Sequence, residues 1–580
     1  MRYHALACDY DGTIAWDSSV SDRTIEALED LKKSGRRLIL VTGRELDDLM
    51  KVFPKLEMFD RVVAENGALV YRPATREERK LAERPPEEFI RELIHRGAER
   101  VSVGRVIVAT WRPHETTAVG VIRDLGLELQ VIFNKGAVMI LPSGVNKATG
   151  LSAALHELGL SPHNVVGIGD AENDHAFLSL CECSIAVENA LDTLKERVDW
   201  VTKQGHGDGA TELVQALIGT DLGYLEDRLH HKLCLGKRAD DTEVCIRPHG
   251  KNVLIAGSSG GGKSTLATGF LERLDEQAYQ YLIVDPEGDY STFHGCVALG
   301  DDQRPPSITE VLDVLSKPEE NAAVNLTGVA LSERPAFFAA LLPRIQELRT
   351  KTGRPHWIVV DEAHHVLPSS WETAGLTVSQ RMYGVMLITL EPDRVAPEIL
   401  STIDVVIAIG KDPAATLKIF CETVGQQPPT LGSATLDHGE AMIWLRDSNE
   451  PPFVFKSTLP KSERRRHRRK YAEGELTPDL CFYFRGPEGK LNLKAQNLAI
   501  FVQMADGVDA ETWLFHLQNG DISRWFHDVI KDPELALEAE LMQRADVSAE
   551  ESRKHIRSEI EQRYILAASF AKKVRFAEIG

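Results

Sequence analysis

Two groups of residues suited to phosphate chemistry lie one after the other along this 580-residue chain. The first starts with Asp9 and Asp11, in Asp-Tyr-Asp-Gly-Thr, and the second is the glycine-rich run 257–264, Gly-Ser-Ser-Gly-Gly-Gly-Lys-Ser. Carboxylates two residues apart in an extended segment can face the same way, and because they repel each other, a bound cation is the natural way to keep both ionised. A glycine-rich loop followed by lysine and serine can wrap around the phosphates of a nucleotide. The sequence therefore predicts two separate phosphate-handling sites.

Two apolar strands would bring the first group to one edge of a sheet. Residues 3–8 and 38–41 read as buried strands joined by a helix, and they end at Asp9 and at Thr42-Gly-Arg44. A strand–helix–strand unit indicates a parallel sheet, and the ligands of such sheets bind beyond the carboxyl ends of the strands. We therefore expect Asp9, Thr42 and Arg44 to lie at one ligand-binding edge.

A second acidic group follows another apolar run. Residues 165–168 read as a strand, and Gly-Asp-Ala-Glu-Asn-Asp comes directly after it, with Lys147 upstream at the start of a predicted helix. Carboxylate oxygens gathered from two strand ends form the kind of site that Mg²⁺ prefers. The predicted metal ligands of this site are Asp9, Asp11, Asp170 and Asp174.

These four motifs, in this order, resemble those of the haloacid dehalogenase (HAD) phosphatase superfamily over roughly residues 1–215. The resemblance implies that Asp9 attacks phosphorus and becomes an aspartyl-phosphate, while Asp11 protonates the leaving oxygen and then activates water. Thr42 and Lys147 would hold the phosphoryl group and offset its charge. Under the same resemblance, the residues that complete the Mg²⁺ site and orient a ligand beside it are Asp170, Asp174 and Asn173.

An insertion separates the second motif from the lysine, at approximately residues 72–143. A predicted helix and predicted strands there resemble the large α/β cap of HAD subclass IIB, which includes phosphatases of sucrose and trehalose phosphates. The cap sets substrate choice in that subclass, so a sugar phosphate is one expected substrate. A turn is the competing interpretation of Asn66-Gly67. The residues expected to contact substrate near the cap are Arg44, Asn66, Gly67 and Asn173.

The glycine-rich run has the context of a nucleotide-binding loop. Residues 252–256 read as a strand before the loop, and residues 264–274 read as a helix after it. Backbone N–H groups and the helix N-terminus would then point at the phosphates, with Lys263 on the terminal phosphates and Ser264 on Mg²⁺. The predicted ATP-binding residues of the loop are Gly257, Ser258, Ser259, Gly260, Gly261, Gly262, Lys263, Ser264 and Thr265.

A further apolar strand ends in Asp-Glu-Ala-His. Asp361 would hold the Mg²⁺ of the nucleotide and Glu362 would polarise the attacking water, so this second carboxylate favours hydrolysis over simple binding. Thr389 ends the next strand and is a candidate sensor of the terminal phosphate. His364 and His365 are interpreted as polar residues at the start of a helix, because no partner lies at the spacing of a metal site.

The Asp-Glu-Ala-His string also occurs in superfamily 2 helicases, but its surroundings resemble another family. Asp285-Pro-Glu-Gly-Asp-Tyr follows the loop and its helix, and the Thr389 strand continues as Leu-Glu-Pro. Over roughly residues 245–415 this is similar to the HerA/FtsK-type ring ATPases, which include DNA translocases and secretion motors. The family often has Gln after the sensor threonine, where this chain has Leu390.

The second resemblance implies a closed homohexameric ring. Ring ATPases of this family take a catalytic arginine from the neighbouring subunit, and such head-to-tail contacts close around an axis. The sequence leaves that arginine unassigned among Arg344, Arg381 and Arg394.

Composition limits the alternatives. A net charge of −20 argues against a surface that is basic throughout. One strongly basic run stands out, Arg-Arg-Arg-His-Arg-Arg-Lys at 464–470. Three interpretations of this run are open: a solvated linker, a nucleic-acid contact or a contact for an acidic partner. The eight cysteines show no zinc-type pairing, so buried reduced thiols and a cytoplasmic location are expected. We expect neither a signal peptide nor a membrane-spanning segment.

The sequence thus predicts an α/β protein of three parts: a HAD-like phosphatase at 1–215, a RecA-like P-loop ATPase at 220–460 and a mainly helical domain at 475–580. The leading hypothesis is a Mg²⁺-dependent phosphatase coupled to an ATP-hydrolysing ring. The alternative is a nucleic-acid translocase whose HAD domain processes phosphorylated DNA or RNA ends or serves as a scaffold. A polynucleotide kinase–phosphatase is disfavoured, because a kinase must avoid the water activation that Glu362 would provide.

Overall fold

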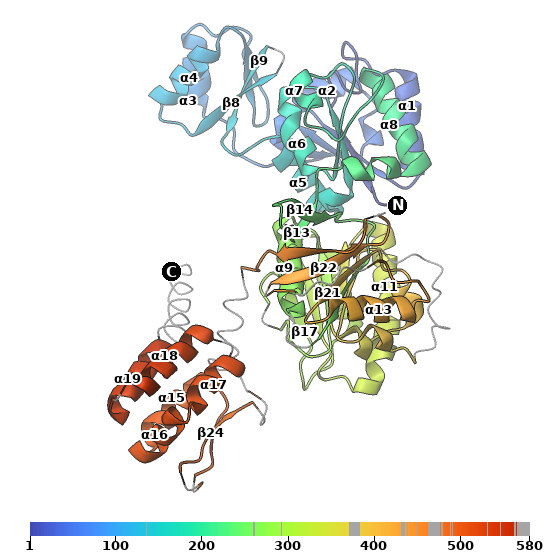
Figure 1. Cartoon of the computed structure of the whole chain (residues 1–580). Helices are drawn as coiled ribbons and strands as arrows, with labels where there is room; N and C mark the ends of the chain where they lie inside the picture. The colour runs from blue at the N-terminus through green and yellow to red at the C-terminus, as the bar shows by residue number, and fades with distance from the viewer. Residues whose placement is uncertain are drawn as a thin grey trace. The chain divides into compact units, whose positions relative to one another are not determined.

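The computed structural model divides the chain into two compact units, Met1–Thr458 and Leu459–Gly580 (Figure 1). Among the described residues, no helix combines the length and the apolar character needed to cross a membrane. The structure describes residues 1–561 and 564, with the exception of 135, 259–261, 292, 371–382, 431–435, 438, 449, 462–475, 477–479, 488, 490, 531, 546 and 562–563.

The N-terminal sheet is the expected Rossmann-like parallel sheet. Its strands are β1 (Ala5–Cys8), β2 (Arg37–Val41), β3 (Arg61–Ala64), β4 (Leu69–Arg72), β5 (Glu77–Lys80), β10 (Val165–Gly169), β11 (Cys183–Ala186) and β12 (Trp200–Val201). They are ordered β12-β11-β10-β1-β2-β3-β4-β5, parallel from β12 to β3 and antiparallel beyond. Because β1 lies between β10 and β2, the residues that follow these three strands, Asp9, Asp170 and Thr42, meet at one edge.

Amphipathic helices pack on this sheet. In the first of them, Ser21 accepts a hydrogen bond from the Thr24 N–H, and Ile25, Leu28 and Leu31 are buried, as their spacing predicts. The helices of this part are α1 (Asp22–Lys33), α2 (Leu46–Val52), α5 (Lys147–Leu158), α6 (His175–Leu180), α7 (Asp192–Lys195) and α8 (His206–Thr220).

The cap is a separate four-stranded antiparallel sheet with two helices. Its elements are α3 (Glu87–His95), β6 (Ser102–Val103), β7 (Val108–Trp111), α4 (Glu115–Asp124), β8 (Leu129–Asn134) and β9 (Ala137–Pro142), with strand order β6-β7-β9-β8. The cap begins later than the expected residue 72, because β5 extends the core sheet. The four residues of β5, Glu-Glu-Arg-Lys, are all exposed, so this edge strand has no apolar alternation that the sequence could reveal.

The ATPase-like sheet has eleven strands and is parallel in its centre. They are β13 (Leu233–Lys237), β14 (Glu243–Ile246), β15 (Val253–Gly257), β16 (Tyr281–Asp285), β17 (Val297–Leu299), β18 (Ala322–Asn325), β19 (Trp357–Val360), β20 (Val385–Thr389), β21 (Val405–Ile409), β22 (Glu440–Leu445) and β23 (Phe453–Ser457). Their order is β14-β13-β23-β22-β21-β15-β20-β19-β16-β18-β17, so β20 separates the loop strand β15 from β19. The helices are α9 (Lys263–Glu276), α10 (Ile308–Ser316), α11 (Arg334–Thr352), α12 (Pro397–Leu400) and α13 (Pro413–Thr423).

One cysteine pair departs from the expectation of reduced thiols. Cys234 and Cys245 lie opposite each other on the antiparallel strands β13 and β14 and form a disulfide. Strand register brings them together, and register is not visible in their sequence spacing. The other six cysteines are free.

The second unit is mainly helical, as predicted. Its elements are β24 (Phe482–Phe484), β25 (Leu493–Ala495), α15 (Leu498–Gly507), α16 (Ala510–Gln518), α17 (Asp521–Asp528), α18 (Pro533–Arg544) and α19 (Ala549–Ile560). Phe482–Phe484 forms a short strand that pairs with β25. Aromatic side chains pack in the core of this unit, where Phe501 contacts Phe484, Trp525 and Phe526.

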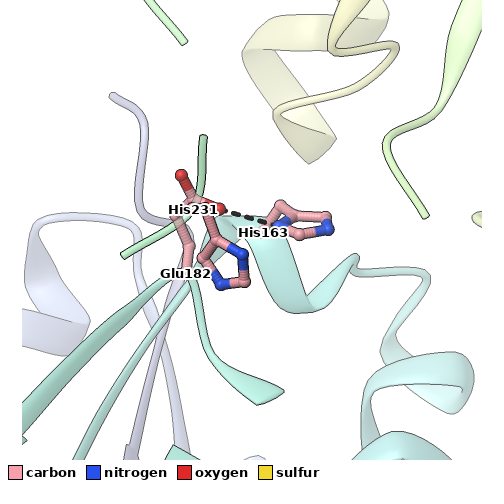
Figure 2. Close-up of side chains that lie close together, drawn as sticks. All are labelled: His163, Glu182 and His231. Atoms are coloured by element: carbon pink, nitrogen blue, oxygen red, sulfur yellow. Dashed lines mark hydrogen bonds and ion pairs between the residues drawn. The ribbon is translucent and has the colours of Figure 1, made fainter. Parts of the chain in front are cut away.

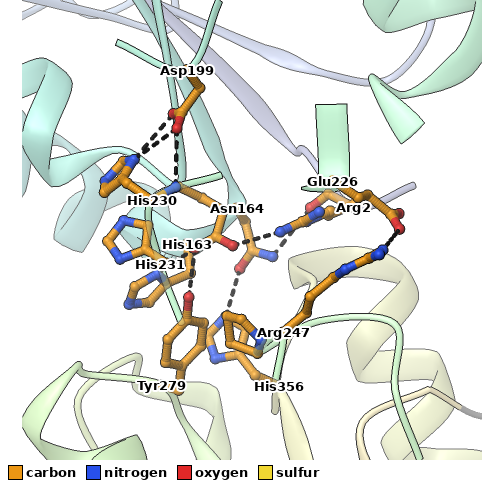
Figure 3. A network of polar contacts seen from close by, with 12 residues as sticks. Arg2, His163, Asn164, Asp199, Glu226, His230, His231, Arg247, Tyr279 and His356 are labelled. Carbon is orange, nitrogen blue, oxygen red and sulfur yellow. Dashed lines mark hydrogen bonds and ion pairs between the residues drawn. The ribbon is translucent and has the colours of Figure 1, made fainter. Parts of the chain in front are cut away.

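A buried polar network joins the two sheets of the first unit (Figure 3). On one side, His163 precedes β10 and Glu182 precedes β11; on the other, Tyr279 precedes β16 and His356 precedes β19. Tyr279 Oη donates to Glu182 Oε2 (2.7 Å), and the Tyr279 ring stacks on His163 with 3.7 Å between centroids. The sheets therefore meet at the amino ends of these strands, whereas the predicted sites follow the carboxyl ends.

His163 makes contacts in both directions across this junction. Its Nδ1 lies 2.7 Å from Glu182 Oε2, and its Nε2 lies 2.6 Å from the backbone oxygen of Gln277, the residue directly after α9. Both partners are acceptors, so a ring N–H at either nitrogen has a partner at this junction.

His356 at the same junction predicts that acid destabilises the first unit. Its Nδ1 accepts from the Gln280 N–H (2.9 Å), its Nε2 faces Asn164 Oδ1 (3.3 Å), and burial lowers its pKa well below the usual value. Below about pH 6.5 the His356 imidazole therefore binds a proton in the unfolded state but stays neutral in the folded state. Each further pH unit of acidification then lowers the free energy of unfolding by about 1 kcal/mol for this group. Urea unfolding at pH 7.5 and 5.5 measures the effect, and His356→Asn, which keeps an acceptor for Gln280, should show a smaller difference. An equal difference in both proteins would contradict the assignment.

Candidate active sites

The first site is a buried acidic group crossed by a lysine. The carboxylates of Asp9, Asp170 and Asp174 have oxygens within 4.8 Å of one another. Lys147 Nζ donates to Asp9 Oδ1 (2.6 Å) and to Asp174 Oδ1 (2.5 Å), while Asp174 Oδ2 accepts from the N–H groups of Asp170 and Ala171. The structure thus brings together the predicted nucleophile, the predicted lysine and two of the predicted metal ligands.

Burial sets the electrostatics of this group. Burial, followed by repulsion from Asp174, raises the pKa of Asp9 well above its usual value, against the attraction of Lys147. Burial would lower the pKa of Lys147, but attraction by Asp174 and Asp9 outweighs it and the pKa is raised. The lysine therefore remains charged, and one lysine faces three carboxylates. A divalent cation is the group that would satisfy the remaining charge.

Asp11 lies outside this group of three. Arg44 holds both of its oxygens, through Nε (2.7 Å) and Nη2 (2.6 Å), and Arg44 also contacts Asp48 and Ser18. Hydrogen bonding to Asp11 is the main cause of the raised pKa of Arg44. Thr42 is fully buried, and its Oγ1 accepts from the Arg44 N–H (3.1 Å). Asp11 was predicted as a metal ligand, and this stays a prediction; in the structure its carboxylate pairs with Arg44.

The other predicted substrate contacts lie on two loops, one after β3 and one after β10, which meet through a hydrogen bond. Asn173 Nδ2 donates to Asn66 Oδ1 (3.0 Å), and Asn66 has a left-handed backbone with φ of 55°. Gly67 has φ of 99°, and a Cβ there would lie 1.8 Å from the backbone oxygen of Asn146, so only glycine fits. The geometry of Gly67 therefore supports the turn interpretation.

Two contributors to this site were missed from the sequence. Thr13, in the first motif, donates from Oγ1 to Asp170 Oδ1 (3.1 Å), and its place beside the Asp-x-Asp pair was the available signal. Glu65 accepts from the N–H groups of Arg105 (2.8 Å), Val106 (2.7 Å) and Ile107 (2.9 Å), which ties the core to the cap. Local sequence patterns do not predict the contact between Glu65 and Arg105, because these residues are 40 positions apart.

The second site follows the carboxyl ends of β15, β20 and β19. Gly257 ends β15 with φ of 146°, and a Cβ there would lie 1.9 Å from the backbone oxygen of Ile409. Lys263 Nζ donates to the backbone oxygens of Gly257 (3.0 Å) and Ser258 (3.2 Å) at the start of α9. Of the predicted loop residues, Gly262, Ser264 and Thr265 are also described, whereas Ser259, Gly260 and Gly261 lie outside the described residues.

The acidic pair follows β19 as predicted. Asp361 Oδ1 accepts from the Glu362 N–H (2.9 Å), and burial raises the pKa of Asp361 to about 7. Burial and repulsion by Glu287 raise the pKa of Glu362. The backbone of Glu362 has a φ of 38°, which is a strained, left-handed conformation for this residue. Such strain persists only where the surroundings enforce it, and it collects at functional sites. Thr389 is fully buried at the end of β20.

A different group of metal-type side chains, His163, Glu182 and His231, belongs to the junction (Figure 2). Glu182 Oε1 pairs with Arg2 Nη2 (2.5 Å), and Oε2 accepts from Tyr279 and faces His163. Hydrogen-bonding to His163 and attraction by Arg2 overcome burial and lower the pKa of Glu182. The carboxylate is satisfied by protein donors, so we interpret the group as a structural ion pair.

Comparison with known proteins covers both parts of the first unit. The family model for haloacid dehalogenase-like hydrolases matches residues 6–103 and 130–214, and that for the central domain of the helicase HerA matches residues 233–350. A haloacid dehalogenase-like hydrolase structure from Bacteroides thetaiotaomicron covers 37% of this chain and 99% of its own, with 19% identity and a TM-score of 0.32.

Curated relatives align with the N-terminal part over almost their whole length. A phosphoglycolate phosphatase from Methanothermobacter thermautotrophicus is 30% identical over 225 residues, which are 37% of this chain and 99% of that protein. One from Haloarcula marismortui is 31% identical over 220 residues, 36% of this chain and 95% of that protein. These relatives and the motif residues gathered in the first site lead to one conclusion. The N-terminal part of the chain belongs to the haloacid dehalogenase-like hydrolases and is a phosphatase, and it is fused to a HerA-type ATPase domain.

Proposed function

We propose that the N-terminal part is a Mg²⁺-dependent phosphomonoester phosphatase that forms a covalent aspartyl-phosphate on Asp9. The observation that carries this proposal is the buried group of Asp9, Asp170 and Asp174, with Lys147 bonded to two of its members. Lys147 and Thr42 are suited to offset the charge of a phosphoryl group placed above Asp9.

Two proton transfers on Asp11 would complete the reaction. An Asp9 oxygen bonds to phosphorus while the bond to the leaving oxygen breaks, and Asp11 gives that oxygen its proton. Asp11 then takes a proton from water, whose oxygen attacks phosphorus; the bond to Asp9 breaks and inorganic phosphate leaves. Asp11 must be protonated for the first step, so its pair with Arg44 has to open when substrate binds. Arg44 is then free to meet an anionic group of the substrate.

The donor set fits Mg²⁺, which prefers carboxylate oxygens. Asp9, Asp170 and Asp174 would hold the ion, since their oxygens already lie within 4.8 Å of one another. A bound Mg²⁺ supplies positive charge that offsets the charge of the phosphoryl group. In this proposal the carboxylate of Asp11 serves acid–base transfer.

Phosphate release from a panel of substrates tests the proposal. The curated relatives are phosphoglycolate phosphatases, so we place phosphoglycolate first, ahead of sugar phosphates and 5′- or 3′-phosphorylated oligonucleotides. Activity should require MgCl₂ and disappear with EDTA. If none of these esters, nor p-nitrophenyl phosphate, released phosphate, the proposal would be wrong.

The second part is proposed to hydrolyse ATP as a homohexameric ring. Lys263 follows β15, Asp361 and Glu362 follow β19, and β20 lies between these two strands, so all three residues follow strands at one edge of the same sheet. Arg344 and Arg394 pair with glutamates of their own subunit, and Arg381 lies outside the described residues, so the arginine of the neighbouring subunit stays unassigned. Mass photometry with a non-hydrolysable ATP analogue should find six chains together. A protein that remained monomeric at micromolar concentration with full ATPase activity would contradict the ring.

A nucleic-acid translocase is the alternative, and the match to the HerA central domain favours it. The basic run 464–470 lies outside the described residues. If it contacts DNA, replacing its arginines with glutamine should weaken binding and flatten the dependence of affinity on salt, because fewer counterions are released. Fluorescence anisotropy with labelled duplex and single strands measures both. Absence of binding by the wild-type protein at low salt would leave the linker interpretation.

A further inference from the structure

His364 lies close to two polar residues, Glu362 just after β19 and Thr389 at the end of β20. Its Nδ1 lies 3.2 Å from Thr389 Oγ1 and 3.5 Å from Glu362 Oε2. The strands are adjacent and parallel, with Val360 opposite Leu387, so residues just beyond their ends face the same space. One ring nitrogen is thus within reach of both the predicted water-activating carboxylate and the predicted phosphate sensor.

Glu362 has an oxygen without a fixed partner. Oε2 is buried and has no hydrogen-bond donor among the residues that the structure describes. A carboxylate that activates water must have its free oxygen held in one direction, since misplacement by about 1 Å can cost about 10²-fold in rate. His364 Nδ1 is the side-chain nitrogen that the structure places beside this oxygen.

His364 is suited to orient the carboxylate without neutralising it. The ring is only 12% exposed, and burial, followed by repulsion from Arg394, lowers its pKa. A neutral imidazole with hydrogen on Nδ1 can donate that hydrogen to Thr389 Oγ1 in this structure, or turn it to Glu362 Oε2, which is 3.5 Å away, and in both cases it leaves the negative charge of Glu362 intact. Thr389 is itself fixed, because its Oγ1 accepts from the Glu391 N–H (3.3 Å).

We propose that His364 is a positioning residue of the ATPase site, which aims Glu362 Oε2 at the attacking water and links it to Thr389. The inference rests on the ATP hydrolysis proposed above. His364, which follows β19, thereby gives Thr389 a polar contact, and in this chain Leu390 occupies the position after that threonine.

Three substitutions at His364 test the role of Nδ1. His364→Ala should lower kcat for ATP hydrolysis about tenfold or more with KM changed less than about twofold, because only the direction of Glu362 is lost. Asn places its amide nitrogen near the position of Nδ1, whereas Gln reaches the position of Nε2, so His364→Asn should recover most of kcat and His364→Gln should not. His365→Ala is the matched control, because its ring lies beside that of His364, with centroids 4.1 Å apart.

A double variant separates positioning from a general loss of structure. In the Glu362→Gln background, His364→Ala should have no further effect on kcat, because the group it directs is gone. A further tenfold loss there, wild-type kcat in His364→Ala, or equal rates for the Asn and Gln variants would overturn the inference. A wild-type protein that binds ATP without hydrolysing it would instead refute the proposed ATPase, and this inference with it. Thermal unfolding and binding of an ATP analogue confirm that each variant is folded.

Discussion

Replacing Asp9 with asparagine should abolish the phosphatase activity. Asn has nearly the same size but no nucleophilic charge, so Mg²⁺-dependent hydrolysis of p-nitrophenyl phosphate should fall by at least about 10³-fold. The fold should survive, because the buried carboxylate is already disfavoured in its charged form, as the raised pKa of Asp9 indicates. Phosphate release by the purified variant, measured beside its thermal unfolding, checks both statements.

The control for this variant is a carboxylate with no part in the site. Asp192 begins α7 and its side chain is 94% exposed, so Asp192→Asn should keep wild-type activity. The ATPase rate of Asp9→Asn should also be unchanged, because Lys263 and Glu362 follow strands of the other sheet. Wild-type phosphatase turnover in Asp9→Asn would exclude the covalent mechanism.

The second large effect is expected at Glu362. Glu362→Gln should bind ATP but hydrolyse it about 10²- to 10⁴-fold more slowly, since the group that polarises water is removed while the phosphate-binding loop is intact. Lys263→Ala should instead weaken ATP binding itself, because Lys263 is the cation of that loop. Nucleotide binding by titration calorimetry and steady-state ATP hydrolysis distinguish the two variants.

Phosphate release from the Asp9 site serves as the internal control in both. It should remain at the wild-type level, because neither residue contacts the acidic group of the N-terminal sheet. An ATPase rate that did not change in Glu362→Gln would show that Asp361 and Glu362 are not the acidic pair of an ATPase site.

Short-range patterns revealed most of the two sites. Asp9, Lys147 and Asp361 were each found at the end of an apolar run or the start of a helix, which is where local sequence constrains position most. Contacts between residues on different strands could not be predicted from the sequence. The bidentate bond between Arg44 and Asp11, the disulfide of Cys234 and the imidazole of His364 each depend on which strand ends lie side by side.

The junction between the two sheets makes it difficult for one of the two parts to be lost during evolution while the other is kept. The loop helix α9 begins at Lys263 and ends against His163, and Tyr279 reaches into the ion pair of Arg2 and Glu182. Cutting the gene between these parts would expose a charged cluster on one fragment and the amino ends of four core strands on the two fragments. Each part would then lose the hydrogen bonds that the other supplies, and it should be less stable than it is in the intact chain. Because both parts belong to one chain, the phosphatase and the ATPase are always made in equal numbers. We therefore expect either activity to be lost through a point substitution at its site and not through deletion of a domain.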